Sequence, residues 1–144
     1  MGKVTAQASK QVGATPERVL EFLRDYRDAR PRILPGNYSA YRVEAGGEGA
    51  GTVIAYHLAA GRRERDYRLA VEEATGGLRE RDQLSSFVST WKVARDGAGA
   101  NVTLAGSWDG AGGIAGVFEG LFAPLVLRRI YGEILNRLAA ELEG

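Results

Sequence analysis

Hydrophobic and polar residues alternate along most of the first 109 positions, and this alternation is typical of half-buried strands. The first alternating run extends from Val4 to Val12. Glycine-containing turns, such as Gly76-Gly77 and Asp96-Gly97, separate the later runs at hairpin spacing. The sequence therefore predicts an antiparallel meander after the first strand. Its six predicted strands cover residues 41–45, 52–60, 63–73, 78–84, 87–94 and 100–108.

Two short helices are expected between the first strand and the meander. Thr15 has the character of a helix N-cap and Pro16 suits the first helical position, so a helix of about three turns should follow. In the next segment, from Ala29 to Leu34, Pro31 and Pro35 limit any helix to a turn or two.

The C-terminal part, residues 112–143, has a different pattern. Between Gly113 and Leu127 the only charged residue is Glu119, and Pro124 interrupts this apolar run. We expect a short helical piece over 113–122, serving either as core packing or as a mobile lid, and then a long helix with Pro124 in its first turn. Apolar residues then recur at helical spacing, which predicts one buried stripe. They are Ile130, Tyr131, Ile134, Leu135, Leu138 and Leu142.

These elements together predict an α+β domain in which one long helix closes one curved sheet. A length of 144 residues suits a single domain, 1–144, and a net charge of +1 gives no reason to expect nucleic acid as a partner. The apolar C-terminal run is too short for a membrane span. The chain has no cysteine and the N-terminus lacks a secretory pattern, so a cytoplasmic protein without a thiolate metal site is expected.

Residues 46–51 form a glycine-rich loop that resembles a phosphate-binding loop only superficially. Phosphate loops are followed by a helix whose N-terminus meets the phosphate, whereas a β-rich run follows here. We therefore interpret this loop as a structural hairpin connection.

Catalytic groups are scarce in the sequence. His57 is the only histidine, and strand alternation places Tyr56 and Leu58 inward and His57 outward, so no Ser-His-acid triad or metal cluster is recognisable. Glu80 and Asp82 share one face of a strand. They could act as acid and base if that face is concave, with Arg65 or Arg81 as countercharge, or could simply form cross-strand ion pairs.

The order of elements and several short motifs resemble one known superfamily over the whole chain. The motifs are Thr15-Pro16-Glu17-Arg18-Val19 with Phe22, Arg30-Pro31, the run from Val43 to Thr52, Glu80-Arg81-Asp82 with Ser85-Ser86, Thr90-Trp91, Gly110 to Ile114 with Phe118-Glu119, Phe122-Ala123-Pro124 and Arg128 to Tyr131. The chain is similar to the helix-grip fold of the START-related (SRPBCC) superfamily, in its bacterial polyketide cyclase/dehydrase and lipid-transport branch. The resemblance implies a seven-stranded curved antiparallel sheet wrapped around the C-terminal helix, with two short helices after the first strand. These motifs mark the fold and the subfamily, and none is a catalytic signature.

The resemblance also implies a cavity between sheet and helix that takes a lipid, sterol-like or polyketide-like molecule. Three interpretations stay open: binding or transport of such a molecule, a cyclase or dehydratase acting in the same cavity, and an interaction domain with a filled core. No cofactor is expected, and the protein could be a monomer or a homodimer. Loops near Pro35 and Gly47 would admit a ligand. The cavity candidates are Ile33, Leu34, Tyr38, Tyr56, Tyr67, Leu69, Phe87, Trp91, Trp108, Phe118, Phe122 and Leu125, with Arg65, Glu80 and Asp82 as polar groups.

Overall fold

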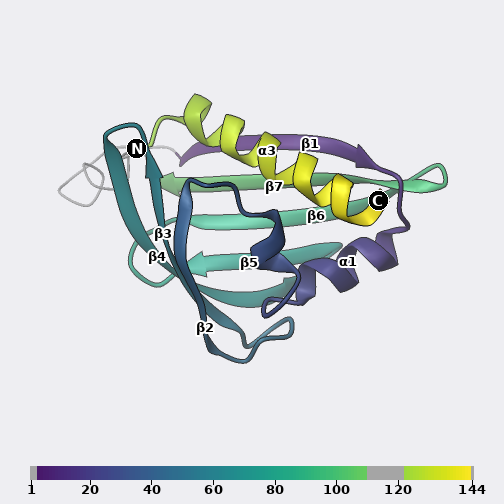
Figure 1. Cartoon of the computed structure of the whole chain (residues 1–144), viewed down its shortest axis with the longest axis horizontal. Helices are drawn as coiled ribbons and strands as arrows, with labels where there is room; N and C mark the ends of the chain where they lie inside the picture. Colours follow the sequence, from purple (N-terminus) through teal and green to yellow (C-terminus); the bar gives the residue numbers. More distant parts are fainter. Residues whose placement is uncertain (1–2, 110–121, 144) are drawn as a thin grey trace.

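The computed structural model describes residues 3–109 and 122–143 and has the predicted α+β, helix-grip architecture (Figure 1). One curved sheet wraps around a long C-terminal helix, and two short helical segments follow the first strand. The strands are β1 (Lys3–Val12), β2 (Tyr38–Ala45), β3 (Val53–Ala60), β4 (Arg63–Ala74), β5 (Gly77–Asp82), β6 (Val88–Asp96) and β7 (Gly99–Asp109). The helical segments are α1 (Pro16–Arg24), the 3-10 helix η1 (Arg30–Ile33) and α3 (Pro124–Glu143).

All neighbouring strands are antiparallel, and the sheet order is β1-β7-β6-β5-β4-β3-β2. The predicted meander from β2 to β7 is therefore confirmed. In addition, β1 pairs with β7 from Lys3 opposite Asp109 to Val12 opposite Ala100. This pairing leaves β1 and β2 as the two edge strands, and it joins the beginning of the chain to the segment that precedes α3.

The start of α1 follows the sequence signals closely. The Thr15 hydroxyl accepts a hydrogen bond from the Arg18 backbone N–H at 3.2 Å, and Pro16 occupies the first turn. The helix ends at Arg24, slightly earlier than the predicted three turns. After it, η1 covers only four residues, as Pro31 and Pro35 indicated, and Leu34 before Pro35 is already extended.

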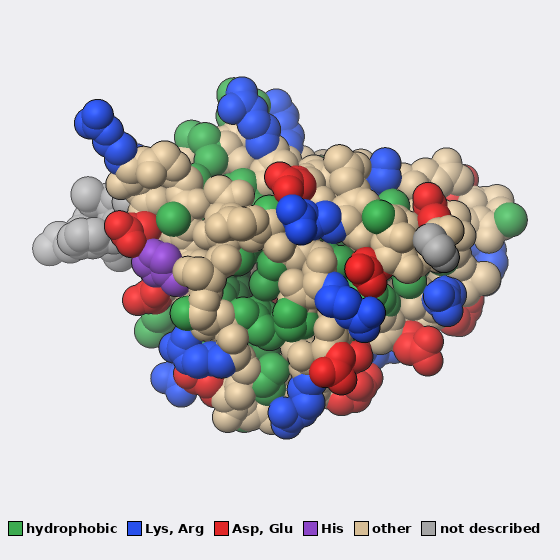
Figure 2. Space-filling model, in the orientation of Figure 1, with side chains coloured by type: hydrophobic (Ala, Val, Ile, Leu, Met, Phe, Trp, Pro, Cys, Tyr) green, Lys and Arg blue, Asp and Glu red, His purple; other side chains and the backbone are tan. Residues whose placement is uncertain are grey.

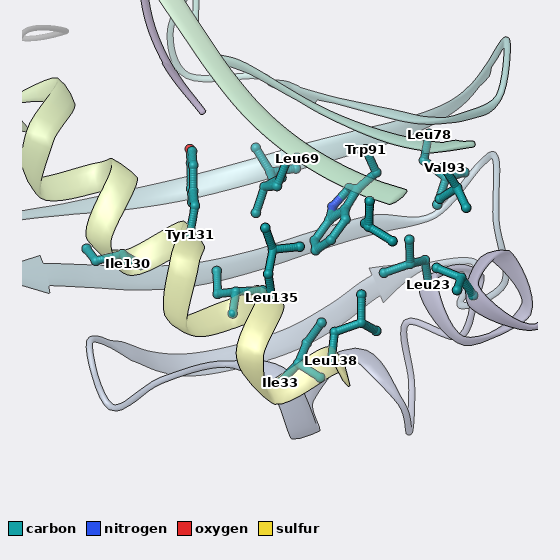
Figure 3. Packing of buried hydrophobic residues seen from close by; sticks show 14 of the residues in the cluster. Leu23, Ile33, Leu69, Leu78, Trp91, Val93, Ile130, Tyr131, Leu135 and Leu138 are labelled. Atoms are coloured by element: carbon teal, nitrogen blue, oxygen red, sulfur yellow. The ribbon is translucent and has the colours of Figure 1, made fainter. Parts of the chain in front are cut away.

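The long helix α3 begins at Pro124, as predicted, and crosses the concave face of the sheet (Figure 1). In Figure 3, Tyr131 and Leu135 of α3 point toward Leu69 and Trp91 of the sheet. Its buried residues match the predicted stripe and add Leu127 and Ala139. No helix among the described residues is long and apolar enough to span a membrane. Most of the helical piece expected over 113–122 lies outside the described residues.

Backbone hydrogen bonds attach the glycine-rich loop to the end of α1. Gly49 N–H donates to the Arg24 carbonyl at 2.9 Å, and Tyr26 N–H donates to the Gly47 carbonyl at 3.0 Å. Both glycines have positive φ, at 58° and 138°, which is costly for a residue with a Cβ. The loop therefore fastens the β2–β3 hairpin to α1.

Gly106 of β7 lies directly against the Tyr131 side chain of α3. A Cβ atom at this position would overlap the Tyr131 hydroxyl and would lie 2.9 Å from Cε1 of Phe87. The absence of a side chain at Gly106 thus seats the Tyr131 ring against the concave face.

We expect Gly106→Ala to destabilise the protein by about 1 to 3 kcal/mol, because the added methyl group overpacks this contact. Combining it with Tyr131→Phe, which removes the nearest atom, should recover part of the loss. Urea denaturation of the two single variants and the double variant measures this coupling.

The matched control is Gly132→Ala in α3, where a Cβ would meet nothing within 4 Å. That substitution should stabilise the protein by about 0.5 to 1 kcal/mol, since alanine is the better helix former. Equal destabilisation by both alanine variants would contradict the role assigned to Gly106.

Candidate functional site

A cavity of about 40 Å³ lies between the concave face of the sheet and α3. Figure 2 shows the molecule hollowed near the centre of this face, with hydrophobic side chains at the bottom of the hollow. Its walls come from η1, the segment after it, strands β2 to β7 and α3. The lining residues are Arg30, Ile33, Leu34, Tyr38, Tyr41, Ile54, Tyr56, Leu58, Tyr67, Leu69, Glu80, Phe87, Ser89, Trp91, Leu104, Leu127, Tyr131 and Ile134.

Aromatic rings form a continuous row across the concave face. Tyr38 meets Tyr56 edge-on at 5.1 Å between ring centroids, and Tyr56 stacks on Tyr67 at 5.3 Å. Phe87 then meets Tyr67 edge-on at 5.1 Å and is followed by Trp108 at 6.3 Å. The first three rings come from the successive strands β2, β3 and β4, because inward-facing positions of paired strands lie side by side. The first four rings of this row, from Tyr38 to Phe87, line the cavity and give it an aromatic wall.

Burial raises the pKa of the tyrosine hydroxyls around the cavity. Desolvation is the largest cause at each ring, and it raises the pKa of Tyr67 and of Tyr41 to about 12. Burial likewise raises the pKa of Tyr38, Tyr56 and Tyr131 well above the ordinary value of about 10. At neutral pH these side chains are therefore neutral hydroxyls that can donate or accept a hydrogen bond.

An ion pair between Arg30 and Glu80 lies at another part of the lining. Nη2 of Arg30 is 2.9 Å from Oε2 of Glu80, and both side chains are almost completely buried. The same carboxylate oxygen accepts a hydrogen bond from the Tyr26 hydroxyl at 2.5 Å, and Oε1 accepts one from the Ser89 hydroxyl at 2.9 Å. Three donors therefore surround Glu80 and hold both oxygens of its side chain in place.

Arg30 is held on several sides. Nη1 donates to the Leu23 carbonyl in the last turn of α1 at 3.0 Å. The guanidinium carbon lies 4.4 Å from the ring centroid of Tyr26 and 5.0 Å from that of Trp91. Desolvation opposes the charge of this buried guanidinium, but the Glu80 carboxylate and the Tyr26 hydroxyl outweigh it and raise the Arg30 pKa. Arg30 thus connects α1, η1 and the sheet.

Asp82 serves a structural purpose outside the lining. One of its oxygens accepts from the backbone N–H groups of Arg68 and Leu84, and the other accepts from the Ser85 hydroxyl at 2.7 Å and from Arg65 at 3.0 Å. These bonds fix the β5–β6 connection. Arg65, one of the two predicted countercharges, pairs with Asp82. Glu80 instead forms its ion pair with Arg30, a partner that the sequence did not predict.

His57 points outward, as strand alternation predicted. Its ring nitrogens lie 2.8 Å from carboxylate oxygens of Asp66 and Glu64, and these hydrogen bonds raise its pKa. Figure 2 shows this histidine at the surface beside acidic side chains, away from the central hollow.

The structure brings most of the predicted cavity residues together. Ile33, Leu34, Tyr38, Tyr56, Tyr67, Leu69, Phe87, Trp91 and Glu80 line the cavity, whereas Phe118 lies outside the described residues. Trp108 and Phe122 are buried in the core beside it without lining it.

Leu125 does not face the cavity: it is 51% exposed and lies in a surface depression with Thr5 and Arg128. The apolar character of the segment suggested otherwise, but the phase of α3 puts Leu127, Tyr131 and Ile134 on the inner side.

Sequence reasoning missed Arg30, Tyr41, Ile54, Leu58, Ser89, Leu104, Leu127, Tyr131 and Ile134 as lining residues. For two of these residues, the sequence pattern already indicated an inward-facing position. Ser89 shares a strand face with Phe87 and Trp91, and Tyr131 belongs to the predicted stripe of α3.

We expect Glu80→Gln to destabilise the protein by about 3 to 5 kcal/mol, because it leaves the buried Arg30 charge unpaired. Replacing both partners, as Arg30→Met with Glu80→Leu, should cost less than either single change. Guanidinium denaturation of Glu80→Gln, Arg30→Met, Glu80→Leu, the double variant and the unchanged protein tests this.

The matched control for this pair is Glu72→Gln, which removes a carboxylate that pairs with Arg79 and Arg81 at the surface. Its effect should be much smaller, since exposed ion pairs contribute little. A loss at Glu80 no larger than that at Glu72 would contradict the anchoring role of the buried pair.

We also expect the protein to lose stability at alkaline pH through its tyrosines. All six have a raised pKa in the folded state, so their contribution is fully present below about pH 10, the unfolded value, and is lost as the pH rises toward 12. Ultraviolet absorbance of phenolate should appear only as the protein unfolds, whereas the chain in guanidinium should titrate near pH 10. Phenolate formation at pH 10 in the folded protein would refute this.

Comparisons with known proteins agree with this fold. The NMR solution structure of KanY protein (ms6282) is 45% identical over 100% of both chains, with a TM-score of 0.89. The protein TTHA0849 from Thermus thermophilus is 19% identical over 97% of both chains, with a TM-score of 0.78. The ginseng major latex-like protein 151 from Panax ginseng is 11% identical over 99% of both chains, with a TM-score of 0.75.

The similarity to TTHA0849 and to the ginseng protein concerns the fold alone. A search of curated proteins found no match to the chain. Residues 3–143 match the family described as polyketide cyclase / dehydrase and lipid transport. The resemblance inferred from the sequence motifs is therefore confirmed. The chain belongs to the polyketide cyclase/dehydrase and lipid transport family.

Proposed function

We propose that the protein binds one small, mostly apolar molecule with oxygen substituents in the cavity between the sheet and α3. Lipid-like, sterol-like and polyketide-like compounds are the classes that the family description suggests. The observation that carries the proposal is the combination of an aromatic wall with five tyrosines, Tyr38, Tyr41, Tyr56, Tyr67 and Tyr131, around one cavity.

The chemistry of the lining supports a ligand of mixed character. Aliphatic side chains such as Leu69, Leu104 and Ile134 provide apolar surface, and the tyrosine rings favour flat molecules through stacking. The neutral hydroxyls add donors and acceptors that orient a ligand without charging the cavity. A polyketide-like molecule with rings and carbonyl or hydroxyl groups fits this description best.

The size of the cavity adds a constraint. A volume of about 40 Å³ accommodates only about three water molecules, so a ligand of this class must displace wall side chains when it enters. The wall at β2 is the least constrained, because β2 is an edge strand with two register irregularities and a positive φ of 55° at Ala40. We place the entrance between the η1–β2 segment, near Leu34 and Pro35, and α3.

A cyclase or dehydratase acting in the same cavity is the alternative, and the buried carboxylate of Glu80 in the lining is the observation in its favour. Its two oxygens already accept bonds from Arg30, Tyr26 and Ser89, however. A carboxylate with these partners is better suited to fixing the structure than to moving protons. Binding is therefore the function that we propose.

Native mass spectrometry of the protein purified from its own host tests the proposal. We expect a stoichiometric small molecule, released by denaturing extraction and identifiable by its mass. Adding it back at 100 times its Kd should stabilise the protein by about 2.7 kcal/mol. The protein could instead be isolated empty and gain no stability from any lipid, sterol-like or polyketide-like compound. That result would support an interaction domain with a filled core.

Two variants of α3 locate the binding site. Ile134→Trp fills the cavity and should abolish ligand retention, whereas Asn136→Trp adds the same side chain on the exposed face and should leave it intact. Circular dichroism and thermal unfolding confirm that both variants are folded. Equal retention in both would exclude the cavity as the site.

A further inference from the structure

Two buried side-chain nitrogens of the cavity lining have no hydrogen-bond partner among the described residues. They are Nε of Arg30 and Nε1 of Trp91. The two residues are only 6% and 2% exposed, and both line the cavity. A buried donor without an acceptor is costly, and such groups in a folded protein require an explanation. The neighbouring hydroxyl of Ser89, in contrast, is satisfied by Glu80.

The two donors belong to stacked side chains. The guanidinium carbon of Arg30 lies 5.0 Å from the ring centroid of Trp91. The other two guanidinium nitrogens have partners: Nη1 donates to the Leu23 carbonyl and Nη2 pairs with Glu80. Nε is therefore the guanidinium nitrogen without an acceptor among the described residues. Figure 3 shows the indole nitrogen of Trp91 on the edge of the ring that faces Leu69 and Tyr131, two further lining residues. The indole donor therefore lies on the side of the ring toward these lining residues.

The local charge decides which acceptor fits. Arg30 and Glu80 neutralise each other at 2.9 Å, so this part of the cavity has no net charge from the pair. An anionic ligand group would gain little from Arg30 and would be repelled by the nearby Glu80 carboxylate. A neutral acceptor avoids this repulsion and still satisfies a donor.

We propose that Trp91 and Arg30 form a polar subsite that receives a neutral carbonyl oxygen of the ligand. The indole N–H of Trp91 donates to this oxygen, and Arg30 supplies the second donor and positive potential. The aromatic body of the ligand then lies against the tyrosine wall. This inference rests on the proposed binding function and specifies the class of ligand: an aromatic ketone or a comparable polyketide-like carbonyl compound.

A pair of matched probes tests the subsite. Acetophenone and α-methylstyrene have the same planar shape, but only the ketone has an acceptor oxygen. In ¹H–¹⁵N NMR spectra the two tryptophans of the chain give two indole signals, and Trp91→Phe identifies the signal of Trp91. We expect acetophenone to shift this signal downfield and α-methylstyrene not to do so. Acetophenone should also bind about tenfold more tightly, the equivalent of one hydrogen bond.

Trp91→Phe removes the indole donor and should abolish the preference for the ketone. The control is Trp108→Phe, which removes the other buried indole, on β7, from a side chain that does not line the cavity. This variant should retain the preference. Comparing the ratio of the two affinities within each variant separates the hydrogen bond from any general change in packing.

Three results would overturn the inference. If both probes bind equally and the Trp91 signal stays in place, the cavity binds ligands but the subsite is wrong. If the indole proton keeps a strong cross-peak to a long-lived water when acetophenone is bound, the donor is satisfied by water and not by the ligand. If neither probe binds and the native ligand search is also empty, the proposed function fails together with the subsite.

Discussion

The buried pair between Arg30 and Glu80 is the interaction on which the rest of the site depends. Removing two charges from water is expensive, and the cost is offset only when attraction and further hydrogen bonds are both well placed. Here the guanidinium also binds the end of α1 at Leu23, while the carboxylate also binds Tyr26 and Ser89. One neutral cluster thus fixes α1 and η1 relative to β5 and β6, and its members Arg30, Glu80 and Ser89 form part of the cavity lining.

The concave face departs from an ordinary core in its use of tyrosine. A phenylalanine ring in each of these positions would fill similar space. It would also avoid the free-energy cost of removing a hydroxyl group from water. Five tyrosines nevertheless line one cavity, and the pKa values of their hydroxyls are raised because burial disfavours the phenolate. This choice of side chain is easier to understand for a surface that meets polar atoms of a guest than for one that only fills space.

Local patterns in the sequence predicted the fold well, because strands, caps and helix stripes are encoded by neighbouring residues. Thr15 and Pro16 start α1, Pro124 starts α3, and alternation separates Tyr56 from His57. The partner of Glu80 could not be found in this way, since Arg30 is fifty positions away and no periodicity connects η1 with β5. Leu125 illustrates a related limit: composition identified an apolar segment, but only the phase of the helix shows which side is inward.

The cavity has two chemically different parts, and this asymmetry favours one orientation of a guest. The stacked pair of Arg30 and Trp91 offers donors beside a neutralised charge, whereas the row of Tyr38, Tyr56 and Tyr67 offers rings and hydroxyls toward the edge strand β2. A molecule that enters past β2 would meet the aromatic wall first and bring its leading oxygen to the donors. The same neutral cluster that holds the helices in place would then also define the polar end of the site.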